Sequence, residues 1–120
     1  MKVEIISVHN QGDYEEEYVM LKVKQKCDIG HYILADSTYT SDGKVSNKVR
    51  HTYWFPDKNV NKGDLISVWT KSGENKKTTS KSGKPLHRFY WGLESAVWND
   101  EGDCAILFEL NTWQFHKVSD

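Results

Sequence analysis

Apolar residues in this chain do not recur with the period of a helix. No stretch places them at positions i, i+3, i+4 and i+7 over three turns. Short alternating segments take their place, as in residues 18–24, where Val19, Leu21 and Val23 alternate with other side chains. Because successive side chains of a strand point to opposite faces, this alternation predicts strands that bury one face.

The other segments are also short runs separated by turn residues. Phe55-Pro56 ends one strand, because proline has no N–H for the ladder, and Asp42-Gly43 is a strong turn signal. The lysine-rich segment 71–85 is expected to be a loop. Further strands are expected at residues 3–8, 29–35, 49–55, 65–70, 88–91, 96–99, 104–110 and, after a tight hairpin at Asn111-Thr112, 113–118.

Together these segments predict an all-β fold. About eight or nine short strands, mainly antiparallel, with turns every 8 to 12 residues or so are typical of a β-sandwich or barrel. A chain of 120 residues can bury roughly two-thirds of its unfolded surface in one compact domain and is too short for two. We therefore expect residues 1–120 to form a single domain.

The composition does not predict a membrane protein. Hydrophobic residues make up 38% of the chain, and no apolar run approaches the ~20 residues that a membrane helix needs. Residues 1–9 alternate in polarity and do not resemble a secretory signal. We expect no membrane association and an intracellular location, or secretion if the sequence is a fragment of a longer protein.

The cysteines and histidines do not predict a metal or cofactor site. Cys27 and Cys104 are the only thiols, and neither belongs to a Cys-x-x-Cys pair. Two buried free thiols are favoured, and a disulfide between opposite sheets is the alternative. Cys27 and His31 are four residues apart, but they flank a turn into a strand, where a period of two governs. We expect no metal and no cofactor.

Acidic residues and nucleophiles form no catalytic motif. Asp13 and the run Glu15-Glu16-Glu17 beside a glycine are expected to form a solvated loop, since a catalytic carboxyl needs a poorly solvated pocket. No Gly-x-Ser-x-Gly elbow and no Gly-rich phosphate loop before a helix is present. We expect no enzyme; a small hydrolase or sugar-binding domain is the third choice.

Several aromatic and glycine-containing segments follow one another in a recognisable order. They are Tyr18-Val19-Met20-Leu21, residues 29–34, Tyr53-Trp54-Phe55-Pro56, residues 62–69, Tyr90-Trp91, Trp98-Asn99 and residues 102–107. Over about residues 10–118 this order resembles the lamin tail domain. The resemblance implies an immunoglobulin-like β-sandwich that acts as an interaction module and not as an enzyme.

The chain also departs from that family. It has Val23 and Lys24 where the family often carries an asparagine, and it contains no coiled-coil rod. The resemblance therefore implies neither filament assembly nor a particular partner.

The aromatic residues provide the first functional hypothesis. Most of the five tryptophans are expected in the core, because aromatic residues on alternating strands are usually buried. Tyr53 and Trp113 lie near turns or charged neighbours and are expected to be exposed. We therefore expect protein binding through these aromatics or through sheet edges, with a protein partner of unknown identity or a second copy of the chain, as a homo-oligomer.

The basic residues provide the alternative. Residues 1–40 and 91–120 carry net charges of −3 and −5, whereas residues 41–90 carry +7. Lysine in an exposed loop can bind phosphate without reading base sequence, although a solvated, mobile loop is the simpler interpretation. The residues expected to contact nucleic acid weakly are those of the 71–88 segment: Lys71, Lys76, Lys77, Lys81, Lys84 and Arg88.

Overall fold

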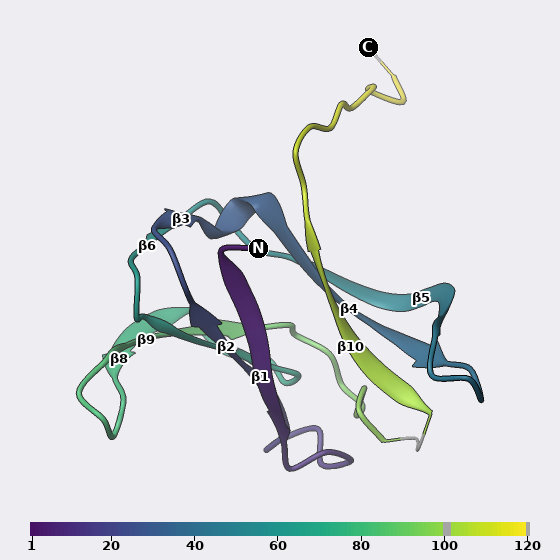
Figure 1. Ribbon diagram of the computed structural model, residues 1–120, viewed down its shortest axis with the longest axis horizontal. Coiled ribbons are helices and arrows are strands. Elements are labelled where there is room, and N and C mark those ends of the chain that lie inside the picture. The colour runs from purple at the N-terminus through teal and green to yellow at the C-terminus, as the bar shows by residue number, and fades with distance from the viewer. Residues whose placement is uncertain (100–101, 120) are drawn as a thin grey trace.

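The computed structural model of the chain describes residues 1–99 and 102–119, and its regular secondary structure is almost wholly β (Figure 1). The all-β class predicted from the sequence is confirmed. Within the described residues there are ten strands and one short 3-10 helix, η1 (Ile29–His31). The strands are β1 (Val3–His9), β2 (Tyr18–Val23), β3 (Cys27–Asp28), β4 (Tyr32–Tyr39), β5 (Val45–Trp54), β6 (Asn59–Val60), β7 (Leu65–Trp69), β8 (Lys76–Thr79), β9 (Pro85–Tyr90) and β10 (Asp103–Glu109).

The larger sheet has five strands in the order β1-β2-β7-β9-β8. All neighbours are antiparallel except β7 and β9, which run parallel with Leu65 opposite Leu86. After β7 the chain crosses to the sheet edge as β8 and returns as β9 between the two. The prediction that residues 71–85 form one loop is therefore wrong. The error arises because β8, an edge strand with two lysines and no apolar residue, has the composition of a loop.

The smaller sheet has three strands in the order β10-β4-β5. The predicted turn at Asp42-Gly43 joins β4 to β5: Gly43 has a φ of +81°, and its N–H donates to the Thr40 carbonyl at 2.8 Å. Glycine adopts such a backbone without steric cost. A separate two-stranded ladder, β3 with β6, lies beside the ends of both sheets (Figure 1).

The two main sheets pack face to face over one hydrophobic core. Alternate residues of β2 and β7 face inward from the larger sheet, and Tyr32 and Leu34 face inward from the smaller one. Val97 and Trp98 complete the core from a segment that is not a strand. The fully buried apolar side chains include Val3, Val19, Leu21, Val23, Ile29, Leu34, Val60 and Ile66.

Two predicted strands are wrong. Residues 96–99 form no strand, because Val97 and Trp98 are buried as part of a loop that packs on the core. Trp113 and Phe115 alternate with polar residues as in a strand, but within the described chain residues 113–118 form no ladder. Figure 1 shows this C-terminal segment leaving the body of the molecule beyond β10. No helix among residues 1–99 and 102–119 is long and apolar enough to cross a membrane.

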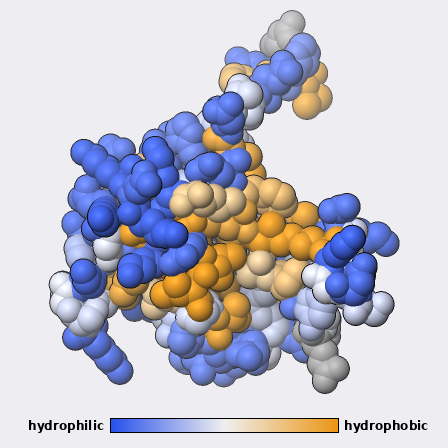
Figure 2. All heavy atoms as spheres, in the orientation of Figure 1, coloured by the Kyte–Doolittle hydropathy of each residue, from blue (hydrophilic) through white to orange (hydrophobic). Residues whose placement is uncertain are grey.

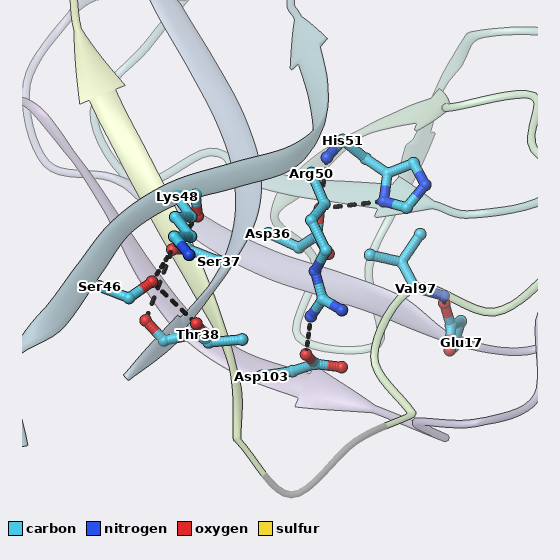
Figure 3. A network of polar contacts seen from close by, with 10 residues as sticks. All are labelled: Glu17, Asp36, Ser37, Thr38, Ser46, Lys48, Arg50, His51, Val97 and Asp103. Carbon is cyan, nitrogen blue, oxygen red and sulfur yellow. Dashed lines mark hydrogen bonds and ion pairs between the residues drawn. The ribbon is translucent and has the colours of Figure 1, made fainter. Parts of the chain in front are cut away.

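Glu17 is fully buried and holds together three segments that are far apart in sequence. One carboxylate oxygen accepts hydrogen bonds from the Thr70 hydroxyl at 2.6 Å and from the Val97 N–H at 2.8 Å, and the other accepts from the Gly12 N–H at 3.0 Å. Figure 3 shows its contact with Val97. The prediction that Glu17 belongs to a solvated acidic loop is therefore wrong, because its three donors replace water.

We expect Glu17→Ala to lower the free energy of unfolding by about 3 kcal/mol, because the buried donors of Thr70 and Val97 and the exposed Gly12 N–H lose their acceptor. Urea denaturation measures the effect. Glu16→Ala is the matched control: this neighbour is exposed, and its removal should change the free energy by less than about 0.5 kcal/mol. Equal effects of the two substitutions would contradict the structural role of Glu17.

Asp64 and His87 form a second buried polar pair, inside the larger sheet. The His87 Nε2 and the Asp64 carboxylate are 2.9 Å apart, and the Asn61 N–H also donates to Asp64 at 3.0 Å. Since an ionised carboxylate can only accept, His87 is the donor. Burial raises the pKa of Asp64, but the hydrogen bonds from His87 and Asn61 outweigh it, so this pKa lies below its usual range.

The lowered pKa of Asp64 predicts a stability that depends on pH. A carboxyl with a depressed pKa stabilises the fold above its unfolded value of about 3.9, and this contribution is lost as the pH falls below it. Asp64→Asn should lower the free energy of unfolding by about 2 kcal/mol at pH 7, and the difference from the unaltered protein should shrink below about pH 4. Denaturation at several pH values tests this, with the exposed Glu74→Gln as control.

Candidate functional site

The smaller sheet exposes an apolar surface on the side away from the core. Register places Ile33 between Phe108 of β10 and Trp54 of β5, and opposite residues of neighbouring strands share a face. The next row, Leu107-Leu34-Tyr53, packs against the core, so the Ile33 row points outward. We call this surface the outer apolar face; it is made of Ile33, Val49, Trp54, Ile106 and Phe108.

Trp54 is the largest side chain of the outer apolar face and is held in a fixed position. Its indole N–H donates to the Gly30 carbonyl at 2.8 Å, yet half of the residue, 50%, remains exposed. Trp113 packs edge-on against it with ring centroids 5.3 Å apart, and His31 contacts Trp113 in the same way at 5.5 Å. An ordered aromatic ring that keeps one face in solvent is typical of a binding anchor.

The structure places the two predicted protein-binding aromatics differently. Trp113 is 47% exposed, as predicted. Tyr53 is not: it packs against Phe55, Phe89 and Trp91, and burial raises the pKa of its hydroxyl, with the Asn75 hydrogen bond as a partial offset. The error arises because successive side chains of a strand point to opposite faces: Tyr53 faces the core and its neighbour Trp54 faces outward.

The prediction that most tryptophans lie in the core is also wrong, since Trp98 alone among the five is buried.

The C-terminal tail, residues 111–119, extends this aromatic group away from the body. Beyond Trp113, Phe115 is 84% exposed and Val118 is fully exposed. Just after β10, the Leu110 N–H donates to the His31 carbonyl at 2.7 Å. The tail that follows presents apolar side chains that its own domain does not cover.

The structure divides the predicted nucleic-acid residues among three places. Lys71 and Arg88 lie over the Trp69 ring, at 5.2 and 4.6 Å from its centroid. Lys76 and Lys77 lie on the edge strand β8, opposite Arg88 and His87. Lys81 is in the turn between β8 and β9, and Lys84 follows it. The six residues therefore do not form one mobile loop.

An aromatic stack crosses the outer surface of the larger sheet. The rings of His9, Tyr18, Trp69 and Tyr90 lie nearly parallel, at successive centroid distances of 4.6, 4.5 and 6.5 Å. Arg88 contacts both Trp69 and Tyr90. The ring faces thus stack on one another and on Arg88, which leaves little face for a base or a sugar ring to stack on.

Four lysines surround a hollow at one end of the larger sheet. The hollow has a volume of about 460 Å³, and Gly63, with a φ of +93°, lies at its wall. Lys84 reaches this glycine, since a Cβ there would lie 3.5 Å from the Lys84 Nζ. Glu4 is the acid at this site, 3.8 Å from Lys24. We call this the lysine hollow; its cations are Lys22, Lys24, Lys62 and Lys84.

The carboxylates between the sheets are held by structural partners. Asp36 is buried and accepts from the His51 N–H at 2.6 Å and ring at 3.1 Å, with the Arg50 Nε at 3.4 Å. Arg50 also bonds to Asp103 of β10, which joins β5 to the far strand of the sheet (Figure 3). Sequence patterns carry no signal for this network, because Asp36 and His51 meet only through the register of β4 and β5.

A second group of reactive side chains lines a hollow of about 410 Å³ near η1, and it includes Cys27, His31 and Glu109. Burial raises the pKa of the Cys27 thiol, so it remains protonated at neutral pH and is a weak nucleophile. The Tyr32 hydroxyl donates to Glu109 at 2.6 Å, and both burial and this bond raise its pKa. Cys27 and Cys104 are free thiols, but both are half-buried and not buried as predicted. The described residues contain no group of three ligand-type side chains able to hold a metal ion.

The hollow near η1 has a thiol, an imidazole and a carboxylate in its lining, but within the described residues no hydrogen bond joins the protonated Cys27 thiol to His31 or Glu109. What the described chain offers for recognition is the outer apolar face with the tail and, separately, the lysine hollow. Comparison of the chain with protein-family models gives no match, and comparison with curated proteins gives none either.

Proposed function

We propose that this chain is a non-enzymatic protein-interaction domain that binds a protein partner on the outer apolar face, beside Trp54 and Trp113. The observation that carries the proposal is the group of exposed apolar side chains on this face and the tail, anchored by an indole whose N–H is hydrogen-bonded. Exposed patches of this kind mark interaction sites, and tryptophan is enriched where binding energy concentrates.

Two further observations support a binding role over catalysis. The buried carboxylates of Glu17, Asp36 and Asp64 are each hydrogen-bonded to structural donors, and the Cys27 thiol is protonated. The resemblance to the lamin tail domain, with an immunoglobulin-like arrangement of the strands, is part of this proposal and agrees with it. The partner is a protein that presents an apolar surface of its own.

The proposal predicts that binding depends on the outer apolar face. Phe108 is 39% exposed, so Phe108→Asp should leave the melting temperature nearly unchanged but weaken partner binding at least tenfold. Trp54→Ser should do the same. A cross-linked partner isolated with the unaltered chain is purified and titrated against each variant by calorimetry.

Val45→Asp is the matched control, since Val45 is similarly exposed but lies at the far end of β5. It should bind like the unaltered chain. If Phe108→Asp and Val45→Asp bind every recovered protein equally well, the outer apolar face is not the docking surface.

Weak, sequence-independent nucleic-acid binding is the second candidate function, and the lysine hollow favours it. Four cations around one glycine turn can contact adjacent phosphates, and only Lys84 of the residues predicted from sequence belongs to this group. Because the aromatic faces are already stacked, affinity would come from phosphate contacts alone and would fall steeply with salt.

This candidate predicts that a duplex oligonucleotide binds at low salt, as measured by fluorescence anisotropy. Lys62→Ala with Lys84→Ala should weaken binding and reduce the slope of log K against log salt by about 0.9 for each phosphate that a lysine no longer neutralises. Lys44→Ala with Lys48→Ala, in the β4–β5 hairpin, is the control of equal charge. Identical slopes for the two pairs would rule out the lysine hollow as the binding site.

A further inference from the structure

The C-terminal tail joins no sheet of the described chain, although part of its sequence has the side-chain pattern of a strand. Its residues 111–119 are enough to match the seven residues of β10 in length, and Trp113 and Phe115 alternate with polar side chains. Within the described residues no backbone hydrogen bond joins residues 111–119 to the body, and Trp113, Phe115 and Val118 expose their apolar side chains to solvent. The tail therefore needs a free sheet edge and an apolar surface.

Three of the four edges of the main sheets are protected against an added strand. The β1 ladder is interrupted by a bulge between Ile5 and Ser7, and the β5 ladder shifts register twice, with Asn47 at a φ of +64°. β8 carries Lys76 and Lys77. Bulges and edge lysines are the devices that keep sheets from pairing with other chains.

The fourth edge, that of β10, has no such protection. Its pairing with β4 is regular from Asp103 to Glu109, and the strand contains no lysine, proline or glycine. Its free side faces β1, and within the described residues no ladder joins these two strands. Figure 2 shows a band of apolar atoms over β1, β10 and β4, where this free edge lies.

Space is available at both ends of this edge. A hollow of about 420 Å³ lies between Val8 of β1 and Ala105 of β10, and the hollow of about 410 Å³ near η1 lies between Lys2 and Glu109. The two hollows thus border the same free edge, at its beginning and at its end. An added strand would cover both.

The tail of the same copy does not lie along this edge. Trp113 packs on Trp54 of β5, and β5 is separated from the free edge of β10 by β4. The tail therefore crosses toward the opposite edge of its own sheet. Only Asn111 and Thr112 separate Leu110 from Trp113.

We propose that this chain forms a strand-exchanged dimer, in which residues 113–118 of each copy add to the free edge of β10 in the other copy. This inference rests on the proposed function and names the partner as a second copy of the chain. The exchange buries Phe115, satisfies the free backbone groups of both strands and makes the contact two-fold symmetric. The outer apolar face then continues across the added strand.

Sedimentation equilibrium of the unaltered chain tests the proposal. The chain should sediment at twice its monomer mass of 13.9 kDa and dissociate on dilution. Phe115→Asp removes the apolar anchor of the tail, and Cys104→Lys places a protecting charge on the β10 edge. Each variant should be a monomer with an unchanged circular dichroism spectrum.

Mixing the two variants separates strand exchange from unspecific association. Phe115→Asp retains an intact β10 edge and Cys104→Lys retains an intact tail, so an equimolar mixture should regain a dimer through one exchange. Val45→Asp, also at an exposed position but distant from tail and edge, should remain a dimer.

A monomeric unaltered chain at millimolar concentration would overturn the exchange, and so would a dimer that Phe115→Asp leaves intact or a mixture that stays monomeric. The proposed function is judged separately, because it fails only if Phe108→Asp leaves partner binding unchanged. A monomer that still binds a different protein on the outer apolar face would therefore refute the exchange and retain the docking surface.

Discussion

The buried carboxylate of Glu17 is the interaction on which the arrangement of this domain depends. It joins the loop after β1, the end of β7 and the segment before β10, so it fixes how the larger sheet meets the chain that leads to the smaller one. Apolar packing buries side chains but does not fix how the segments are oriented. Three directional hydrogen bonds to the Glu17 carboxylate fix the relative positions of the segments that donate them. The core residues Val97 and Trp98 owe their place to this contact.

Local patterns predicted the parts of the fold that are governed by local rules. Period-two alternation located β2 and β7, and Asp42-Gly43 located the β4–β5 turn, because strand faces and positive φ depend on neighbouring residues. The local pattern gave wrong predictions where contacts between residues distant in sequence determine the structure. Glu17 stands in an acidic, loop-like sequence, but it is buried because donors as distant as Val97 bind its carboxylate. Residues Lys76–Thr79 have the composition of a loop and form a strand because they pair with β9.

The same division applies to the candidate sites. Exposure of Trp113 could be inferred from its charged and polar neighbours. Choosing Trp54 over Tyr53 as the exposed aromatic required knowing which face of β5 meets the core, and most residues of this strand are exposed on both faces. The lysine hollow combines residues from β2, the turn before β7 and the β8–β9 hairpin. The spacing of these lysines along the chain does not predict that they lie together, because only the order of the strands in the sheet brings them close.

The long separation of β4 and β10 along the chain bears on how the protein folds during synthesis. Thr38 and Asp103 are partners in one ladder, so the inner edge of β4 stays unpaired until the ribosome has added every strand that lies between them in sequence. The Glu17 contact with Val97 closes almost as late. The apolar first half of β4 is thus exposed in the nascent chain while those strands are made, which makes β4 the segment where chaperone binding or misassembly would begin.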